Sequence, residues 1–273
     1  MSETRIIPLP DGGQLNARME GPEGAPCLVF SNSVLTDLSV WDAQAGVLGD
    51  RYRVLRYDQR GHGASSVAKR AMDFTRYGAD VLAILDAFGI ARCTFVGLSM
   101  GVPTGLAALA AAHDRFERFV AVDGVSRSAP GREAFWSERR DTARAEGMDV
   151  IAAQTAPRWL PGLPEDAPRV RRLREMIAAT PVEGFAAATH ALARYDQSDA
   201  LRCLACPVLG IAGENDGAMP DTMRSQFGAV AGARMSVIPG AGHLPNFQVP
   251  EAFNAALSAF LEATAPDPKM ETR

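Results

Sequence analysis

A serine flanked by glycines is the first feature of this sequence that could do chemistry. The pentapeptide Gly97-Leu98-Ser99-Met100-Gly101 continues an apolar run at 94–98 and opens a helical pattern at 100–112. Glycines two residues before and two after the serine leave room for a tight strand-to-helix turn. The turn lifts the Ser99 hydroxyl clear of the sheet and points the first helical N–H groups, beginning with Met100, at a bound group. This arrangement suits a nucleophile whose attack creates an oxyanion.

A serine nucleophile needs a general base, and histidine is the usual one. The candidates are the four histidines of the chain, His62, His113, His190 and His243. His243 ends the glycine-rich run 239–243 directly after the last predicted strand, so it should reach the same sheet edge as the serine. His62 is expected to brace its own loop, His113 to end a helix, and His190 to occupy an ordinary amphipathic position. We therefore predict His243 as the base.

The base needs a carboxylate that holds its tautomer and favours the imidazolium. Asp216 follows the predicted strand 207–212, and Asp123 ends the predicted strand 116–122. Both therefore lie at the carboxyl edge of the sheet. The chain order of serine, aspartate and histidine fits either residue, so this criterion leaves both open.

An oxyanion needs a second donor besides the N–H of Met100. The loop after the third predicted strand, Asn32-Ser33-Val34, is the natural source. We predict that the backbone N–H of Val34 is the partner of the Met100 N–H.

Alternating strands and helices must position these residues. The predicted strands lie at 5–8, 15–20, 26–31, 52–57, 94–98, 116–122, 207–212 and 235–238, and the predicted helices at 41–48, 74–88, 100–112, 221–230 and 250–263. Asp11-Gly12-Gly13 predicts a hairpin turn between the first two strands. Such alternation favours an α/β fold, with a mostly parallel eight-stranded sheet flanked by helices on both faces.

One segment breaks this alternation. Residues 126–198 contain helical patterns, several prolines and no convincing strand. A helical insertion between two core strands is typical of a cap over the carboxyl edge, where ligands bind in open α/β sheets. The predicted organisation is a core of residues 1–125 and 199–265, a cap of residues 126–198 and a disordered tail of residues 266–273.

Composition narrows the classes of partner. The 273 residues are 47% hydrophobic and carry a net charge of −4, which disfavours nucleic acid as a ligand. No apolar run is long enough to cross a bilayer, and the N-terminus lacks the layout of a signal peptide, so we expect a cytoplasmic protein. Cys203 and Cys206 have no second ligand pair nearby, so no metal site is expected. The sequence leaves homo-oligomerisation open.

These motifs together resemble the α/β-hydrolase superfamily over about residues 5–263. The resemblance rests on the Asn32 loop, the Ser99 pentapeptide and the runs 58–63, 213–216 and 240–243. It favours Asp216 over Asp123 as the acid, because the glycine-led run 213–216 is similar to the superfamily's acid loop. Residues 31–33, 36–38, 41–42 and 55–66 are more closely similar to the 3-oxoadipate enol-lactone hydrolases of aromatic compound catabolism.

The resemblance implies a cofactor-free serine hydrolase of a small lactone or carboxylic ester, acting through an acyl-enzyme on Ser99. It implies substrate contacts from Asn32, Ser33 and Trp159. A substrate carboxylate would need a cation, for which Arg158, beside Trp159, is chosen over Arg139 and Arg140. Val102-Pro103 departs from the family's Gly after Ser-Met-Gly. The alternatives are a carbon–carbon bond hydrolase of diketones, a cofactor-free haloperoxidase, and a non-enzymatic small-molecule receptor.

Overall fold

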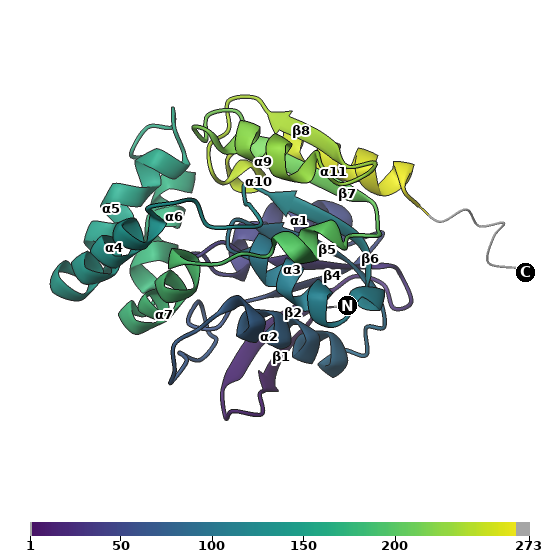
Figure 1. Cartoon of the computed structure of the whole chain (residues 1–273), viewed down its shortest axis with the longest axis horizontal. Coiled ribbons are helices and arrows are strands. Elements are labelled where there is room, and N and C mark those ends of the chain that lie inside the picture. Colours follow the sequence, from purple (N-terminus) through teal and green to yellow (C-terminus); the bar gives the residue numbers. More distant parts are fainter. Residues whose placement is uncertain (1, 266–273) are drawn as a thin grey trace, which may run out of the picture.

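The computed structural model describes residues 2–265, and the predicted tail at 266–273 lies outside them. Eight strands form one sheet in the order β1-β2-β4-β3-β5-β6-β7-β8 (Figure 1). Their bounds are β1 Ser2–Pro8, β2 Gln14–Glu20, β3 Cys27–Ser31, β4 Arg53–Tyr57, β5 Cys93–Leu98, β6 Phe116–Val122, β7 Val208–Gly213 and β8 Arg234–Ile238. The predicted fold class is confirmed.

The sheet is antiparallel at one edge and parallel elsewhere. β2 pairs antiparallel with both β1 and β4. The remaining neighbours, from β4 through β3, β5, β6 and β7 to β8, pair in parallel. Every residue of β3, β5 and β7 is buried, as expected for strands covered on both faces. The carboxyl ends of these strands therefore meet at one edge of the sheet.

Helices cover both faces, because successive side chains of the central strands point to opposite sides. Val29 and Phe95 pack in one core with helices α2 Phe74–Ala87 and α3 Gly101–Ala111. Phe30 and Val96 pack in a second core with helices α1 Asp42–Leu48 and α11 Pro250–Ala263. Helix α9 Met219–Phe227 follows β7 and packs against it.

The helical insertion, residues 126–198, lies between β6 and β7. It holds α4 Arg132–Glu146, α5 Met148–Trp159, α6 Pro168–Ala179 and α7 Val182–Ala193. Figure 1 shows these four helices grouped at one end of the sheet. The two ends of the insertion are tied together, because Ser128 N–H donates to Tyr195 O at 2.9 Å and Gln197 N–H donates to Ser126 O at 2.8 Å. The division into core and cap stays a prediction.

Two short helices were not predicted, namely α8 Ser198–Arg202 and α10 Pro245–Gln248. Within residues 2–265 no helix combines the length and apolar character that a bilayer crossing requires.

Candidate active site

The turn between β5 and α3 holds Ser99 in a left-handed backbone conformation, with φ at 52°. Its N–H donates to Val122 O at 2.7 Å, which ties the turn to the neighbouring strand β6. A Cβ atom at Gly97 would overlap the carbonyl of Gly101, and one at Gly101 would overlap the carbonyl of Ser31. Both glycines are thus required by close backbone approach, which is the physical content of the Gly-x-Ser-x-Gly pattern.

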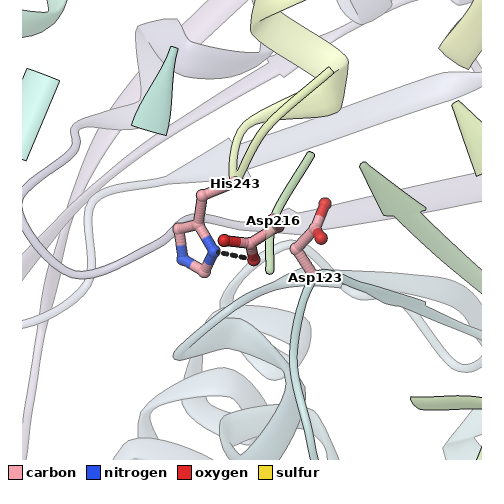
Figure 2. A group of neighbouring side chains, drawn as sticks. All are labelled: Asp123, Asp216 and His243. Carbon is pink, nitrogen blue, oxygen red and sulfur yellow. Dashed lines mark hydrogen bonds and ion pairs between the residues drawn. The ribbon is translucent and has the colours of Figure 1, made fainter. Parts of the chain in front are cut away.

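Ser99, His243 and Asp216 form one continuous hydrogen-bonded chain. Ser99 Oγ lies 2.9 Å from His243 Nε2 and donates to it in the tautomer that carries its proton on Nδ1. His243 Nδ1–H in turn donates to Asp216 Oδ2 at 2.7 Å, the bond drawn dashed in Figure 2. The structure therefore brings together three predicted site residues from three separate loops. Their catalytic roles stay predictions.

Packing and backbone hydrogen bonds fix the His243 loop. The N–H of Gly242 donates to Gln248 Oε1 at 2.8 Å, and Asn215 N–H donates to Ala241 O at 2.7 Å. The Trp159 ring, at the end of α5, lies against the imidazole with 4.9 Å between ring centroids. A residue of the insertion therefore contacts the predicted base directly.

Asp123, the rival acid, does not reach the imidazole. Its side chain is fully buried, and both carboxyl oxygens face the N–H of Gly213 at 3.0 and 3.1 Å. Figure 2 shows Asp216 between His243 and Asp123. Burial, followed by repulsion from Asp216, raises the pKa of Asp123 well above its usual value. Asp123 is therefore expected to be a neutral acid behind an ionised one.

Asp216 is held in its charged form. Burial opposes ionisation, but attraction to His243 and hydrogen bonds from His243 and Asp123 outweigh it and lower the pKa of Asp216. The facing oxygen and nitrogen atoms of Asp123, Asp216 and His243 lie within 4.8 Å of one another, a spacing that a cation could bridge. However, His243 Nδ1 and Asp216 Oδ2 are already bonded to each other, and Asp123 accepts from the N–H of Gly213.

The predicted oxyanion donors lie beside the nucleophile. Met100 is buried at the start of α3, and Val34 is a lining residue of the same cavity as Ser99. No acceptor within residues 2–265 takes the N–H of either residue, so both remain available for a ligand oxygen.

The Asn32 loop is braced from behind. Asn32 Nδ2 donates to Thr36 O at 2.6 Å, and the amide of Gln59 donates to Asn32 O. Asn32 and Ser33 are fully buried and do not line the cavity, so the expected contact of their side chains with substrate stays a prediction. The bonds made by Asn32 hold the backbone next to Val34.

A cavity of about 390 Å³ opens onto Ser99 and His243. The insertion forms part of its wall, including the predicted residues Arg158 and Trp159. Arg139 also lines the cavity, whereas Arg140 lies outside it, bonded to Ser137.

Sequence reasoning missed several other residues of this wall. They are Arg132, Phe135 and Trp136 on α4, and Tyr195 near the end of the insertion. The α4 residues follow the helical spacing of one face together with Arg139, so the signal was present in the sequence.

The other three histidines lie away from this chain of bonds. His62 is buried with Nδ1 3.2 Å from Arg60 O, in agreement with a bracing role. His113 is exposed beside Asp114, and His190 is exposed on α7. None of the three lines the cavity.

Comparisons with known proteins point to one family. A family model described as "Alpha/beta hydrolase family" matches residues 30–256. The curated "3-oxoadipate enol-lactonase 2" of Acinetobacter baylyi is 35% identical over 252 residues, which cover 91% of this chain and 93% of that relative. These findings confirm the resemblance inferred from the motifs.

Solved structures agree with the sequence relatives. A hydrolase from Pseudomonas aeruginosa PA01 is 37% identical with a TM-score of 0.89, covering 95% of this chain and 98% of that one. The enol-lactonase from Burkholderia xenovorans LB400 is 34% identical with a TM-score of 0.87, covering 92% of this chain and 98% of that one.

Proposed function

The chain belongs to the alpha/beta hydrolase family, and we propose that it is a serine hydrolase of a small lactone or carboxylic ester. One observation carries the proposal: the Ser99 hydroxyl, 2.9 Å from His243 Nε2, lines a cavity that Val34 also lines, and the backbone N–H groups of Val34 and Met100 have no acceptor within residues 2–265. A nucleophile, its base and an oxyanion site are the three parts that acyl transfer requires.

The proposed reaction proceeds in two halves. Ser99 Oγ attacks the carbonyl carbon while its proton passes to His243 Nε2, and Asp216 stabilises the resulting imidazolium. The N–H groups of Val34 and Met100 bind the oxyanion. The carbon–oxygen bond to the leaving group then breaks, and His243 returns the proton to the departing oxygen, which leaves an acyl-enzyme on Ser99.

Water completes the cycle. His243 takes a proton from water as the water oxygen attacks the acyl carbon. The bond to Ser99 Oγ breaks, the hydroxyl regains its proton from His243, and the acid is released. In a lactone the departing oxygen stays tethered to the acyl group, so the net change is ring opening by one water molecule.

The relatives support an enol-lactone as the substrate type. Two curated relatives named 3-oxoadipate enol-lactonase are 33% and 35% identical over more than nine tenths of this chain. A cavity of about 390 Å³ suits a small acyl group, since ligand pockets of roughly 300–1,000 Å³ are usual. As a hydrolase of such an enol-lactone, the protein would act in the breakdown of aromatic compounds.

Labelling with a fluorophosphonate tests the proposal, because this reagent reacts with an activated serine. Ser99→Ala should abolish labelling. Ser128→Ala is the matched control, since Ser128 lines the same cavity but donates to Ala193 O. A substrate panel of lactones, aryl esters and diketones, with an assay for peroxide-dependent halogenation, would then rank the reactions. Labelled protein that turns over diketones far faster than any ester or lactone would refute the proposal.

A further inference from the structure

Three arginines of the cavity wall lie close to one aromatic ring. The guanidinium carbons of Arg132, Arg139 and Arg158 lie 4.2, 5.7 and 5.7 Å from the centroid of the Phe135 ring. Arg132 and Arg139 come from α4 and Arg158 from α5, and all three line the cavity that opens onto Ser99. Such convergence concentrates positive potential in a low-dielectric pocket.

None of the three forms an ion pair within residues 2–265, although Asp216 is near enough to attract Arg132 and Arg158. Arg139 is buried, and its polar neighbours are neutral, with Thr155 Oγ1 at 2.5 Å and Gln154 Oε1 at 3.5 Å. Burial, followed by repulsion from Arg158 and Arg132, lowers the pKa of Arg139 to about 10. Buried charge without a counter-ion is costly, so a structure that keeps it needs a reason for doing so.

Acidic partners are available nearby but pair with other arginines. Arg144, at the end of α4, bonds to Glu183 at 2.8 Å, and Arg194 bonds to Glu133 at 2.9 Å. Glu133 adjoins Arg132 in sequence yet points to this other arginine. On α4 and α5, the arginines without an ion pair to the described residues are therefore the three that line the cavity.

The net charge of the side chains that line the cavity indicates how many negative charges a ligand can bring into it. Its lining holds two acids, Asp123 and Asp216. Asp123 is fully buried against the N–H of Gly213, with a raised pKa, and Asp216 is ionised but already bonded to His243. Three guanidinium groups thus face one ionised carboxylate, which leaves an excess of two positive charges.

We infer that this cavity binds an acyl group bearing two carboxylates, with Arg132, Arg139 and Arg158 as their partners. The inference rests on the proposed function, because it places the scissile carbonyl at Ser99. Guanidinium groups bind carboxylates through paired N–H donors, and three groups spread around a ring suit two separate carboxylates better than one compact dianion. Phe135 would orient the guanidinium groups through their faces.

A series of 4-nitrophenyl monoesters tests the inference on the intact protein. The acyl groups are butyrate, glutarate and propane-1,2,3-tricarboxylate esterified at one end, which retain no, one and two free carboxylates. The expected order of kcat/KM is two above one above none, with about a 10- to 100-fold step for each carboxylate, the range of a charged hydrogen bond. The 4-nitrophenyl ester of 4-phosphonobutyrate supplies a compact dianion for comparison.

Variants link any preference to the arginines. Arg132→Gln and Arg158→Gln are the main tests, since neither side chain is buried, and each should reduce the ratio of kcat/KM between the dicarboxylate and butyrate esters by about 10-fold or more. Arg140→Gln is the matched control on α4: its side chain bonds to Ser137 outside the cavity, so the ratio should be unchanged.

The outcomes separate the inference from the function on which it rests. Turnover of the butyrate ester without any gain from carboxylates, a faster phosphonate ester, or a ratio unaffected in Arg132→Gln and Arg158→Gln would each overturn the inference and leave the serine hydrolase standing. If no ester is turned over and Ser99 is not labelled, the proposed function fails. Calorimetric titration with propane-1,2,3-tricarboxylate and with butyrate would then decide the arginine site alone: a preference below about 10-fold would refute it.

Discussion

Asp216 and Asp123 lie side by side behind His243, but only Asp216 reaches the imidazole. Asp216 Oδ2 is 2.7 Å from His243 Nδ1, whereas the oxygens of Asp123 face the N–H of Gly213. The pKa values of the two carboxyl groups move in opposite directions, upward for buried Asp123 and downward for Asp216 beside His243. A neutral acid thus supports an ionised one, which gives the two aspartates different roles despite their proximity.

The first prediction concerns these two acids. Asp216→Asn should lower kcat for a neutral aryl ester by several orders of magnitude, about 10⁴ by analogy with serine proteases, because an amide no longer favours the imidazolium. Asp123→Asn should have a much smaller effect, since an amide can replace a neutral carboxyl group. Steady-state kinetics of both variants decides between them, and the reverse ranking would refute the assignment.

The second prediction concerns stability and pH. Burial lowers the pKa of His62 to about 4, whereas an unfolded histidine titrates near 6.5. Between these values the unfolded state binds a proton at this histidine that the folded state does not, so the contribution of His62 to the free energy of unfolding falls as pH falls from about 6.5 to about 4. This contribution amounts to up to about 3 kcal/mol. Urea unfolding across this range measures it.

Variants isolate the His62 contribution. His62→Asn should remove this contribution from the pH dependence of the parent, whatever its effect on stability at pH 7. His113→Gln is the control, because the His113 side chain is 75% exposed, and it should retain the full slope. Equal slopes in His62→Asn and the parent would show that His62 does not carry the effect.

The third prediction concerns the nucleophile turn. Gly97→Ala should destabilise the protein at or beyond the upper end of about 1–3 kcal/mol, because its Cβ would overlap the backbone of Gly101. Gly46→Ala is a contrasting change at an exposed position of helix α1, where a Cβ meets nothing within 4 Å, and it should stabilise by about 0.5–1 kcal/mol. Thermal unfolding of both variants checks the pair; similar melting temperatures would contradict the role assigned to Gly97.

The central strands could be predicted because a strand that is buried on both faces is apolar at nearly every position of its sequence. β5 and β7 are largely apolar runs of six residues, and all eight predicted strands are present. The short helix α10 escaped detection because four residues carry no periodicity. Its position depends on tertiary bonds, such as Asn246 Nδ2 to Val40 O at 2.9 Å.

The site residues could be predicted from the sequence only where the local backbone geometry dictates the residue type. Ser99 and His243 stand in glycine-rich turns, which limit the conformations of the chain around them. The choice between Asp216 and Asp123 depends on how neighbouring strands are aligned, which chain order does not contain. Arg132 and Phe135 were missed because helical spacing defines a face of α4 without saying what that face meets.

The central claim is that Ser99 forms an acyl-enzyme, and trapping that species tests it most directly. The enzyme would be mixed rapidly with 4-nitrophenyl butyrate, quenched in acid within the first turnover, digested and analysed by mass spectrometry. The account predicts a butyryl group on the peptide that contains Ser99, and loss of both adduct and turnover in Ser99→Ala. Turnover that persists in Ser99→Ala, or a butyryl group found on another residue of the parent, would contradict it.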